Sequence, residues 1–204
     1  MKTGAPAFGT PEYIRATQMT GQMCRYYKLP MRSSGVCASN VPDGQAMWET
    51  SNSIWAAVQS GTNMVYHAAG WLEGGLIASP EKFVMDCEVL QHIQRYFDKK
   101  ITDTAVDDIA IAAIKEVGPD GHYFGCDHTQ ERYESAFYQP MISDWSNYEA
   151  WNLNGGVWTA ERAHKVYKEI INEFEPPPMD ISIKEELQQF VRRRKSEGGA
   201  PTDF

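Results

Sequence analysis

Three candidate strands separated by helical patterns constrain the fold of this chain more than any other feature of its sequence. Residues 31–36, 62–67 and 121–126 each have the length of a strand and follow a proline or glycine that stops a helix. The segments between them carry apolar residues at helical spacing. Strands that alternate with helices favour a parallel sheet covered by helices, because a parallel pair needs a long crossover connection. The pattern leaves open whether that sheet stays open or closes into a barrel.

The expected helices begin at residues that cap helices well. Thr10 precedes Pro11, and Ser79 precedes Pro80, so both starts combine a capping oxygen with a proline in the first turn. Ser182 has Glu185 three positions later, which is typical of a capping box. The other expected starts are Asp43, Thr104 and Thr159. Prolines or glycines that stop a helix stand at Pro30, Gly61, Gly118 and Pro176.

The pattern changes near residue 142. Residues 1–142 hold about three strand-and-helix units, whereas a closed eight-unit barrel needs ~250 residues, so this part is expected to be a piece of a larger α/β sheet. Residues 143–204 are expected to form an aromatic-rich loop and carboxy-terminal helices that pack on the sheet. The aromatic residues of that loop are Trp145, Tyr148, Trp151 and Trp158.

The composition excludes several classes of partner and site. The formal net charge is −8, and the one compact basic cluster, residues 192–195, lies near the tail, so nucleic acid is not an expected partner. No segment approaches the ~18 apolar residues of a membrane span, so we expect a cytoplasmic protein without membrane contact. Four cysteines occur without a C-x-x-C pair, which predicts reduced thiols rather than a metal site or a disulfide framework.

The loop after the second expected strand carries the most suggestive group of side chains. His67 ends the strand, and Trp71 and Glu73 follow within a glycine-rich segment. A ring face and a negative charge both favour a cation, so this loop could form a cage for an ammonium group. The alternative is a packed tryptophan beside a capped turn.

Two further loops are expected at the same end of the sheet. The loop after the first strand offers Asp43 and Gln45, although Asp43 is better explained as a helix cap. The loop after the third strand offers Tyr123 and His128. The alternative interpretation of this loop is structural, with Asp127 or Thr129 as a cap of the next helix. Because βα loops gather on one face of a parallel barrel, we expect His67, Trp71 and His128 to converge there.

Residues 120–125 fit the pattern D-x-H-x-x-G, in which corrinoid-binding domains offer a histidine to cobalt. The pattern fixes only three positions, and the S-x-L signal of such domains does not follow it. We therefore reject cobalt ligation by His122. The sequence also lacks a nucleophile elbow, a P-loop, a dinucleotide fingerprint and H-E-x-x-H, so hydrolase, nucleotide-binding and zinc-protease functions are not supported.

Nearly the whole chain resembles the trimethylamine methyltransferase family. The resemblance is carried by residues 66–75, YHAAGWLEGG, and 121–125, GHYFG, and extends through 143–145 and 175–178. It implies an α/β fold, namely the carboxy-terminal part of a TIM (β/α)8 barrel with a helical carboxy-terminal extension. It also implies transfer of a methyl group from trimethylamine or a quaternary amine such as glycine betaine to the cobalt of a separate corrinoid protein. No cofactor would be bound directly, and homo-oligomers are left open.

The resemblance transfers these motifs, and the roles that we expect for the residues of the three loops are our own assignment. The expected catalytic residues are His67 and His128, and the expected substrate-binding residues are Trp71, Glu73, Tyr123, Asp43 and Gln45. The pyrrolysine of some family members would fall within residues 40–44, where every residue here is ordinary, so a permanently cationic amine is the favoured substrate.

Two other functions remain open at this point. One is a noncatalytic interaction or scaffold piece, because the chain is short for its family. The other is a different barrel enzyme in which Glu73 and His67 act as acid and base.

Overall fold

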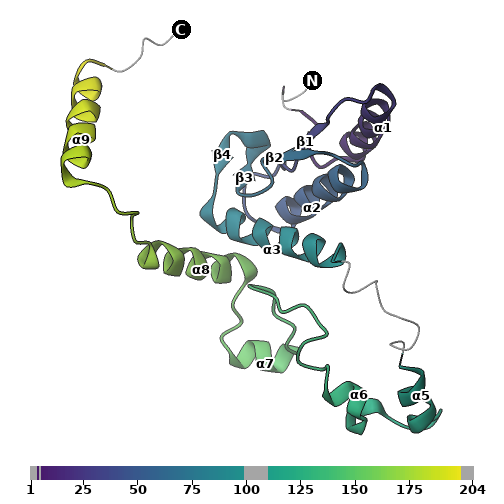
Figure 1. Cartoon of the computed structure of the whole chain (residues 1–204). Helices are drawn as coiled ribbons and strands as arrows, with labels where there is room; N and C mark the ends of the chain where they lie inside the picture. The colour runs from purple at the N-terminus through teal and green to yellow at the C-terminus, as the bar shows by residue number, and fades with distance from the viewer. Residues whose placement is uncertain (1–3, 5, 99–109, 199–204) are drawn as a thin grey trace. The chain divides into compact units, whose positions relative to one another are not determined.

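The computed structural model describes residues 4, 6–98 and 110–198 (Figure 1). It divides into two compact units, residues 1–169 and 170–204. The first unit holds all the strands of the described residues and most of the helices.

A parallel strand pair linked by a helix lies at the centre of the first unit. β1 (Arg32–Ser34) pairs with β2 (Met64–Tyr66), so that Ser33 stands opposite Val65. Helix α2 (Gly44–Gln59) connects the two strands. This arrangement confirms the expected strand–helix–strand unit, although both strands are shorter than the segments expected to form them.

Helix α1 (Pro11–Tyr27) precedes β1 and packs on α2 (Figure 1). Thr10 caps its start by accepting the Tyr13 N–H at 3.3 Å, as the sequence predicted. The two helices approach closely at Gly21, where an added Cβ would lie 2.5 Å from the carbonyl oxygen of Ser60. A glycine is therefore required at this crossing.

A small antiparallel hairpin occupies the segment that the sequence assigned to a loop. β3 (Trp71–Leu72) pairs with β4 (Ile77–Ala78) across a 3₁₀ turn, η1 (Glu73–Gly75). The glycines on both sides of β3 adopt positive φ, and this lets the chain reverse twice within a few residues. Helix α3 (Pro80–Tyr96) follows, capped by Ser79 as predicted.

The core of the first unit contains two clusters of buried apolar side chains. One cluster joins Cys37, Ala46 and Leu72, and brings the loop after β1, the start of α2 and the hairpin together. A second cluster is formed by Val84, Met85, Ile142 and Ala163. Burial of apolar area at these points stabilises the unit by roughly 25 cal/mol per Å².

The prediction of a third strand at residues 121–126 is wrong. Residues 121–126 contain the 3₁₀ turn η3 (Tyr123–Gly125), and helix α6 (Asp127–Gln130) follows it. A strand needs a partner for its backbone groups, and a short segment with β-favouring residues does not specify one. Helix α5 (Ile111–Val117) confirms the end of the helix expected before this segment, whereas its expected start at Thr104 lies outside the described residues.

The described residues are mainly helical with few strands, and they do not show a TIM barrel. The later elements are α7 (Tyr148–Leu153), α8 (Thr159–Glu173) and, in the second unit, α9 (Ile181–Ser196). Helix α8 is confirmed, whereas α7 falls in the segment expected to be a loop. Helix α9 is capped by Asp180 rather than Ser182, because the Asp180 carboxylate accepts the Ser182 N–H at 2.8 Å. Among the helices described, none is long and apolar enough to cross a bilayer.

Candidate functional site

The loops that follow β1 and β2 meet at the carboxyl end of the parallel pair. The N–H of Glu73 donates to the carbonyl oxygen of Ser39 at 2.8 Å, and the N–H of Gly74 donates to that of Cys37 at 2.9 Å. The Cys37 thiol donates to the carbonyl oxygen of Trp71 at 3.2 Å. These bonds join two of the three loops that the sequence placed on one face.

His67 and Trp71 lie in ring contact within this loop cluster. Their ring centroids are 5.3 Å apart and the planes meet at 86°, an edge-to-face arrangement. The Nδ1 of His67 lies 3.3 Å from the hydroxyl oxygen of Ser34 at the end of β1. The sequence therefore placed His67 and Trp71 together correctly.

Both His67 and Glu73 adopt the left-handed backbone conformation, each with φ of 49°. This region is disfavoured for residues with a Cβ, and it persists only where the surrounding structure holds it. At Glu73 the N–H bond to Ser39 holds the turn, and the carboxylate stays exposed to solvent. The site thus presents one negative charge and two rings from a single constrained segment.

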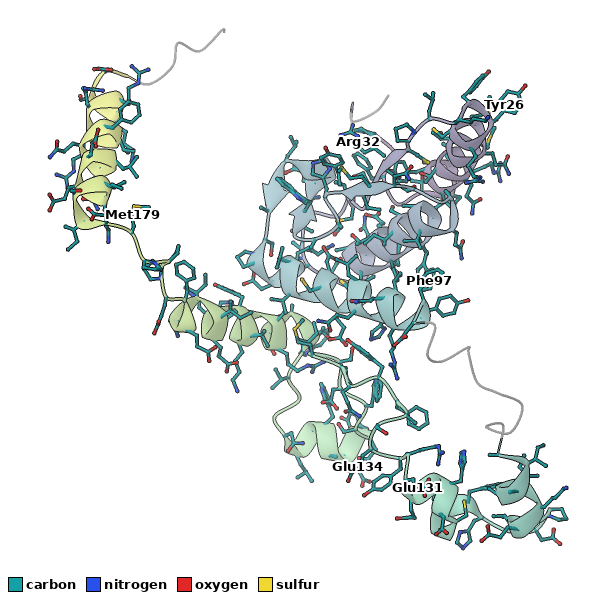
Figure 2. The ribbon with its side chains drawn as sticks, in the orientation of Figure 1. Tyr26, Arg32, Phe97, Glu131, Glu134 and Met179 are labelled. Atoms are coloured by element: carbon teal, nitrogen blue, oxygen red, sulfur yellow. The ribbon has the colours of Figure 1, made fainter. Side chains whose placement is uncertain are left out.

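A hollow of about 360 Å³ lies between α1 and the strand pair, and His67 is one of its walls. The other aromatic walls are Phe8, Tyr13 and Tyr66. Arg32, labelled on β1 in Figure 2, places its Cζ 4.5 Å from the centroid of the Tyr66 ring. A volume of this size is in the range of small-ligand sites and exceeds the needs of a methylated amine.

Phe8 and Tyr13 belong to the hollow although the sequence analysis did not select them. Their rings pack edge to face at 5.4 Å, and the Tyr13 hydroxyl donates to the carbonyl oxygen of Ser34 at 3.1 Å. Tyr13 lies in the first turn of α1. No spacing rule marks it, because its contact with β1 is a tertiary one.

Asp43 and Gln45 make local hydrogen bonds in the described structure. Asp43 caps α2 by accepting the Ala46 N–H at 3.1 Å, as the sequence favoured. The Gln45 amide donates to Glu49 at 2.9 Å. The other Glu49 oxygen accepts the N–H of Ala38 at 2.7 Å and so holds the loop after β1.

His128 lines a separate hollow of about 240 Å³ with residues of α5 and α6. It shares this hollow with Glu116, Asp127 and Arg132. Within the described ranges, neither His128 nor Tyr123 makes a hydrogen bond or ring contact with His67 or Trp71. The expected convergence of these loops is therefore not seen as a contact, and the roles of His128 and Tyr123 stay predictions.

The remaining reactive groups do not suggest another chemistry. Burial raises the pKa of the Cys37 thiol, so this cysteine is a poor nucleophile. His122 is exposed and lies 5.7 Å, between ring centroids, from Phe124 within the η3 turn rather than in a sheet. Over the residues described, no three His, Cys, Asp or Glu side chains gather closely enough to hold a metal ion.

Comparison with known proteins identifies the family. Residues 1–199 match the family described as trimethylamine methyltransferase (MTTB). The chain belongs to the trimethylamine methyltransferase family. The match covers the hollow, the hairpin and the helices of the first unit, so the candidate site lies within the family's shared sequence.

The trimethylamine methyltransferase family includes relatives with two named substrates. The chain is 34% identical over 200 residues to a glycine betaine methyltransferase of Desulfitobacterium hafniense (strain Y51), covering 98% of this chain and 41% of the relative. It is 28% identical to a trimethylamine methyltransferase of D. hafniense (strain DSM 10664 / DCB-2), covering 98% of this chain and 40% of that protein. A trimethylamine methyltransferase of Methanosarcina barkeri (strain Fusaro / DSM 804) is 24% identical, with 94% and 38% covered. The chain thus spans about 40% of the length of these relatives.

Proposed function

We propose that this chain is part of a corrinoid-dependent amine methyltransferase. Its substrate would be a methylated amine, with a quaternary amine such as glycine betaine favoured over trimethylamine. The methyl acceptor would be the cobalt of a corrinoid held by a separate protein. Family membership and the aromatic hollow beside His67 support this proposal together.

The hollow supports the proposal because four of its walls are aromatic rings, which suit a methylated cation, while the guanidinium of Arg32 also lines it and lies over the Tyr66 ring. Aromatic faces attract such cations, and they do so most strongly where water is displaced. Phe8, Tyr13, Tyr66 and His67 line the hollow, and Trp71 packs on His67. The exposed carboxylate of Glu73 adds a favourable charge at the same end of the sheet.

For this reaction the protein mainly has to orient the amine and remove water from it. The bond between nitrogen and the methyl carbon breaks, its electron pair stays on nitrogen, and the acceptor supplies the pair for the new bond. A quaternary ammonium leaves as a neutral tertiary amine, so no proton donor is needed. The chain's residues would then act by aligning the amine and excluding water.

The proposal assigns a role to each of the side chains expected at the site. His67 orients one wall, Trp71 supports that wall, and Glu73 favours the charge of the substrate. Asp43 and Gln45, in local hydrogen bonds near the same loop, and Tyr123, in η3, remain proposed substrate-binding residues. His128, at the second hollow, remains a proposed catalytic residue.

The complete catalytic unit would be larger than this chain. The parallel pair β1–β2, with α1 and α2, is the kind of unit from which a (β/α)8 barrel is built. Because the chain spans about 40% of its relatives, further units of the barrel and the surface for the corrinoid protein are proposed to lie in matching segments outside these residues.

Titration with tetramethylammonium and with glycine betaine, followed by NMR, tests the proposal. Binding should shift the resonances of His67 and Trp71, and His67→Ala and Trp71→Ala should each weaken it by about five-fold, the loss of one ring contact. Trp158→Ala is the matched control, because Trp158 is 74% exposed and does not line the hollow. Binding that is unaffected by His67→Ala would exclude this hollow as the amine site.

A noncatalytic role is the second candidate, and the short span relative to the relatives favours it. A methyl-transfer assay separates the two. The chain and a full-length glycine betaine methyltransferase are each incubated with reduced corrinoid protein and glycine betaine. Methylated corrinoid from the full-length enzyme, together with amine binding but no transfer by the chain, would support the noncatalytic role.

A further inference from the structure

A fully buried ion pair lies beneath the loop that carries Trp71. Lys82 and Asp86 stand one turn apart on α3, and they are 0% and 1% exposed. The Lys82 ammonium donates to both oxygens of Asp86, at 2.5 Å to Oδ2, and to the Thr50 hydroxyl on α2 at 2.8 Å. Every one of these donors and acceptors is thus satisfied inside the protein.

The pair reaches the site through one backbone amide. Asp86 Oδ2 accepts the N–H of Gly70 at 2.9 Å. The carbonyl oxygen of Gly70 accepts the Ser79 N–H, also at 2.9 Å. An added Cβ at Gly70 would lie 3.1 Å from the Cβ of Phe83, and φ there is +85°. Gly70 is therefore fixed at its N–H, its Cα and its carbonyl.

Fixing Gly70 fixes the rings beside it. Trp71 is the next residue, and its ring meets that of His67, three residues before Gly70. The left-handed backbone of His67 and the hairpin pairing of Trp71 with Ala78 leave the intervening residues little freedom. The direction in which the Trp71 ring leaves the backbone thus depends on the position of Gly70.

Stability alone does not account for this pair. Burying two charges removes their hydration, and an apolar pair of similar volume is often as stable or more stable. Burial raises the pKa of Asp86, which reflects that cost, and the Lys82 ammonium opposes the shift. An apolar pair, however, would offer no acceptor to the Gly70 N–H.

The neighbouring loop is held in the same way. The buried carboxylate of Glu49, on α2, accepts the N–H groups of Ala38 at 2.7 Å and Ser39 at 3.1 Å. Each βα loop of the parallel pair is therefore held by a carboxylate of the helix that follows it. Because a helix holds such an acceptor in a fixed position, the hydrogen bonds restrain the loops as well.

We propose that Lys82 and Asp86 are positioning residues for the methylated-amine site, acting through Gly70 on the Trp71 and His67 rings. The proposal rests on the amine site proposed above. Asp86 supplies the acceptor, and Lys82 keeps that acceptor ionised and pointed at the loop. Neither side chain would touch the substrate.

Two double variants of the chain separate positioning from stability. Lys82→Met with Asp86→Leu removes both charges and the acceptor, whereas Lys82→Met with Asp86→Asn removes the charges and retains an acceptor oxygen. The first should fold, shift the Gly70 amide and Trp71 resonances, and lower tetramethylammonium affinity by about five-fold. The second should recover most of that affinity. Equal affinity for wild type and both variants would overturn the proposal.

A matched control uses the pair Lys165 and Glu169, which has the same spacing but lies exposed on α8. Lys165→Met with Glu169→Leu should leave tetramethylammonium affinity and the Gly70 amide unchanged. If the Lys82 and Asp86 double variants do not fold, hydrogen exchange of the wild-type chain tests the positioning role instead. The Gly70 amide should be protected, and exchange as fast as in an open loop would contradict the proposal.

The same measurements distinguish the two proposals. Absence of tetramethylammonium binding by the wild-type chain would contradict the proposed amine site. The Gly70 amide and Trp71 resonances of the two buried-pair double variants would still show whether the ion pair sets the loop. Unchanged Trp71 resonances in both variants would overturn the positioning role whatever the amine result.

Discussion

The Nδ1 of His164, on α8, lies 2.8 Å from a carboxylate oxygen of Glu81 in the first turn of α3. This contact lies within the first unit and joins elements that are distant in sequence. It lowers the pKa of Glu81, chiefly through the hydrogen bond from His164, with a smaller contribution from the Ser79 hydroxyl. The strength of this contact between α3 and α8 therefore depends on pH.

The first prediction concerns that carboxylate. A lowered pKa in the folded state means that the contribution of Glu81 to stability is present above its ordinary value of 4.5 and is lost as pH falls through the lower folded value. His164→Ala should raise the pKa of Glu81 toward the ordinary value. A carbon-13 NMR titration of the Glu81 carboxyl group measures the change, and identical titration curves in the two proteins would contradict the prediction.

The second prediction separates the two roles considered for Asp43. Asp43→Ala should lower the free energy of unfolding by about 1 kcal/mol, because it removes the cap of α2, whereas Asp43→Asn should keep most of the cap. Urea unfolding measures both. Asn147→Ala, which removes the cap of α7, serves as a control for capping alone. If Asp43→Asn weakens amine binding without loss of stability, Asp43 acts at the site as well as in the cap.

The third prediction tests which part of Tyr13 serves the hollow. Tyr13→Phe removes the hydroxyl that donates to Ser34 but retains the ring, so tetramethylammonium affinity should stay within about two-fold of wild type. Tyr13→Ala removes a wall and should weaken binding by about five-fold. Isothermal titration calorimetry compares the variants, and equal losses in both would mean that the hydroxyl rather than the ring is required.

The fourth prediction concerns the cysteines. Cys37 is fully buried and its thiol pKa is raised by burial, so it should react with iodoacetamide far more slowly than the partly exposed Cys24. Mass spectrometry of peptides taken over a time course measures both rates. Rapid labelling of Cys37 in the folded chain would show that the contact between the loop after β1 and the hairpin opens readily.

The features that could be predicted from the sequence are those set by neighbouring residues. Thr10, Asp43 and Ser79 cap their helices as expected, because capping depends on an oxygen and an amide only a few positions apart. The placement of His67 and Trp71 in one loop could also be predicted, because they are only four positions apart, whereas the edge-to-face contact of their rings was not predicted. At α9 two nearby oxygens compete, and Asp180 rather than Ser182 forms the cap.

The features that could not be predicted depend on distant partners. The segment around Tyr123 has the composition of a strand, yet its backbone turns, and nothing local signals the absence of a neighbouring strand. Tyr13 joins the hollow through the hydrogen bond from its hydroxyl to Ser34, and Phe8 through its ring contact with Tyr13. The buried bond between Asp86 and Gly70 links residues that no sequence pattern connects.

The positive φ of His67 has a consequence for how substitutions at this position are read. Glycine adopts that backbone more easily than histidine, so replacing His67 with glycine relieves strain while it removes the imidazole. Thermal stability and amine affinity should therefore move in opposite directions in such a variant. Position 67 is one where a screen that rewards only melting temperature would select against the ring that the proposed chemistry uses.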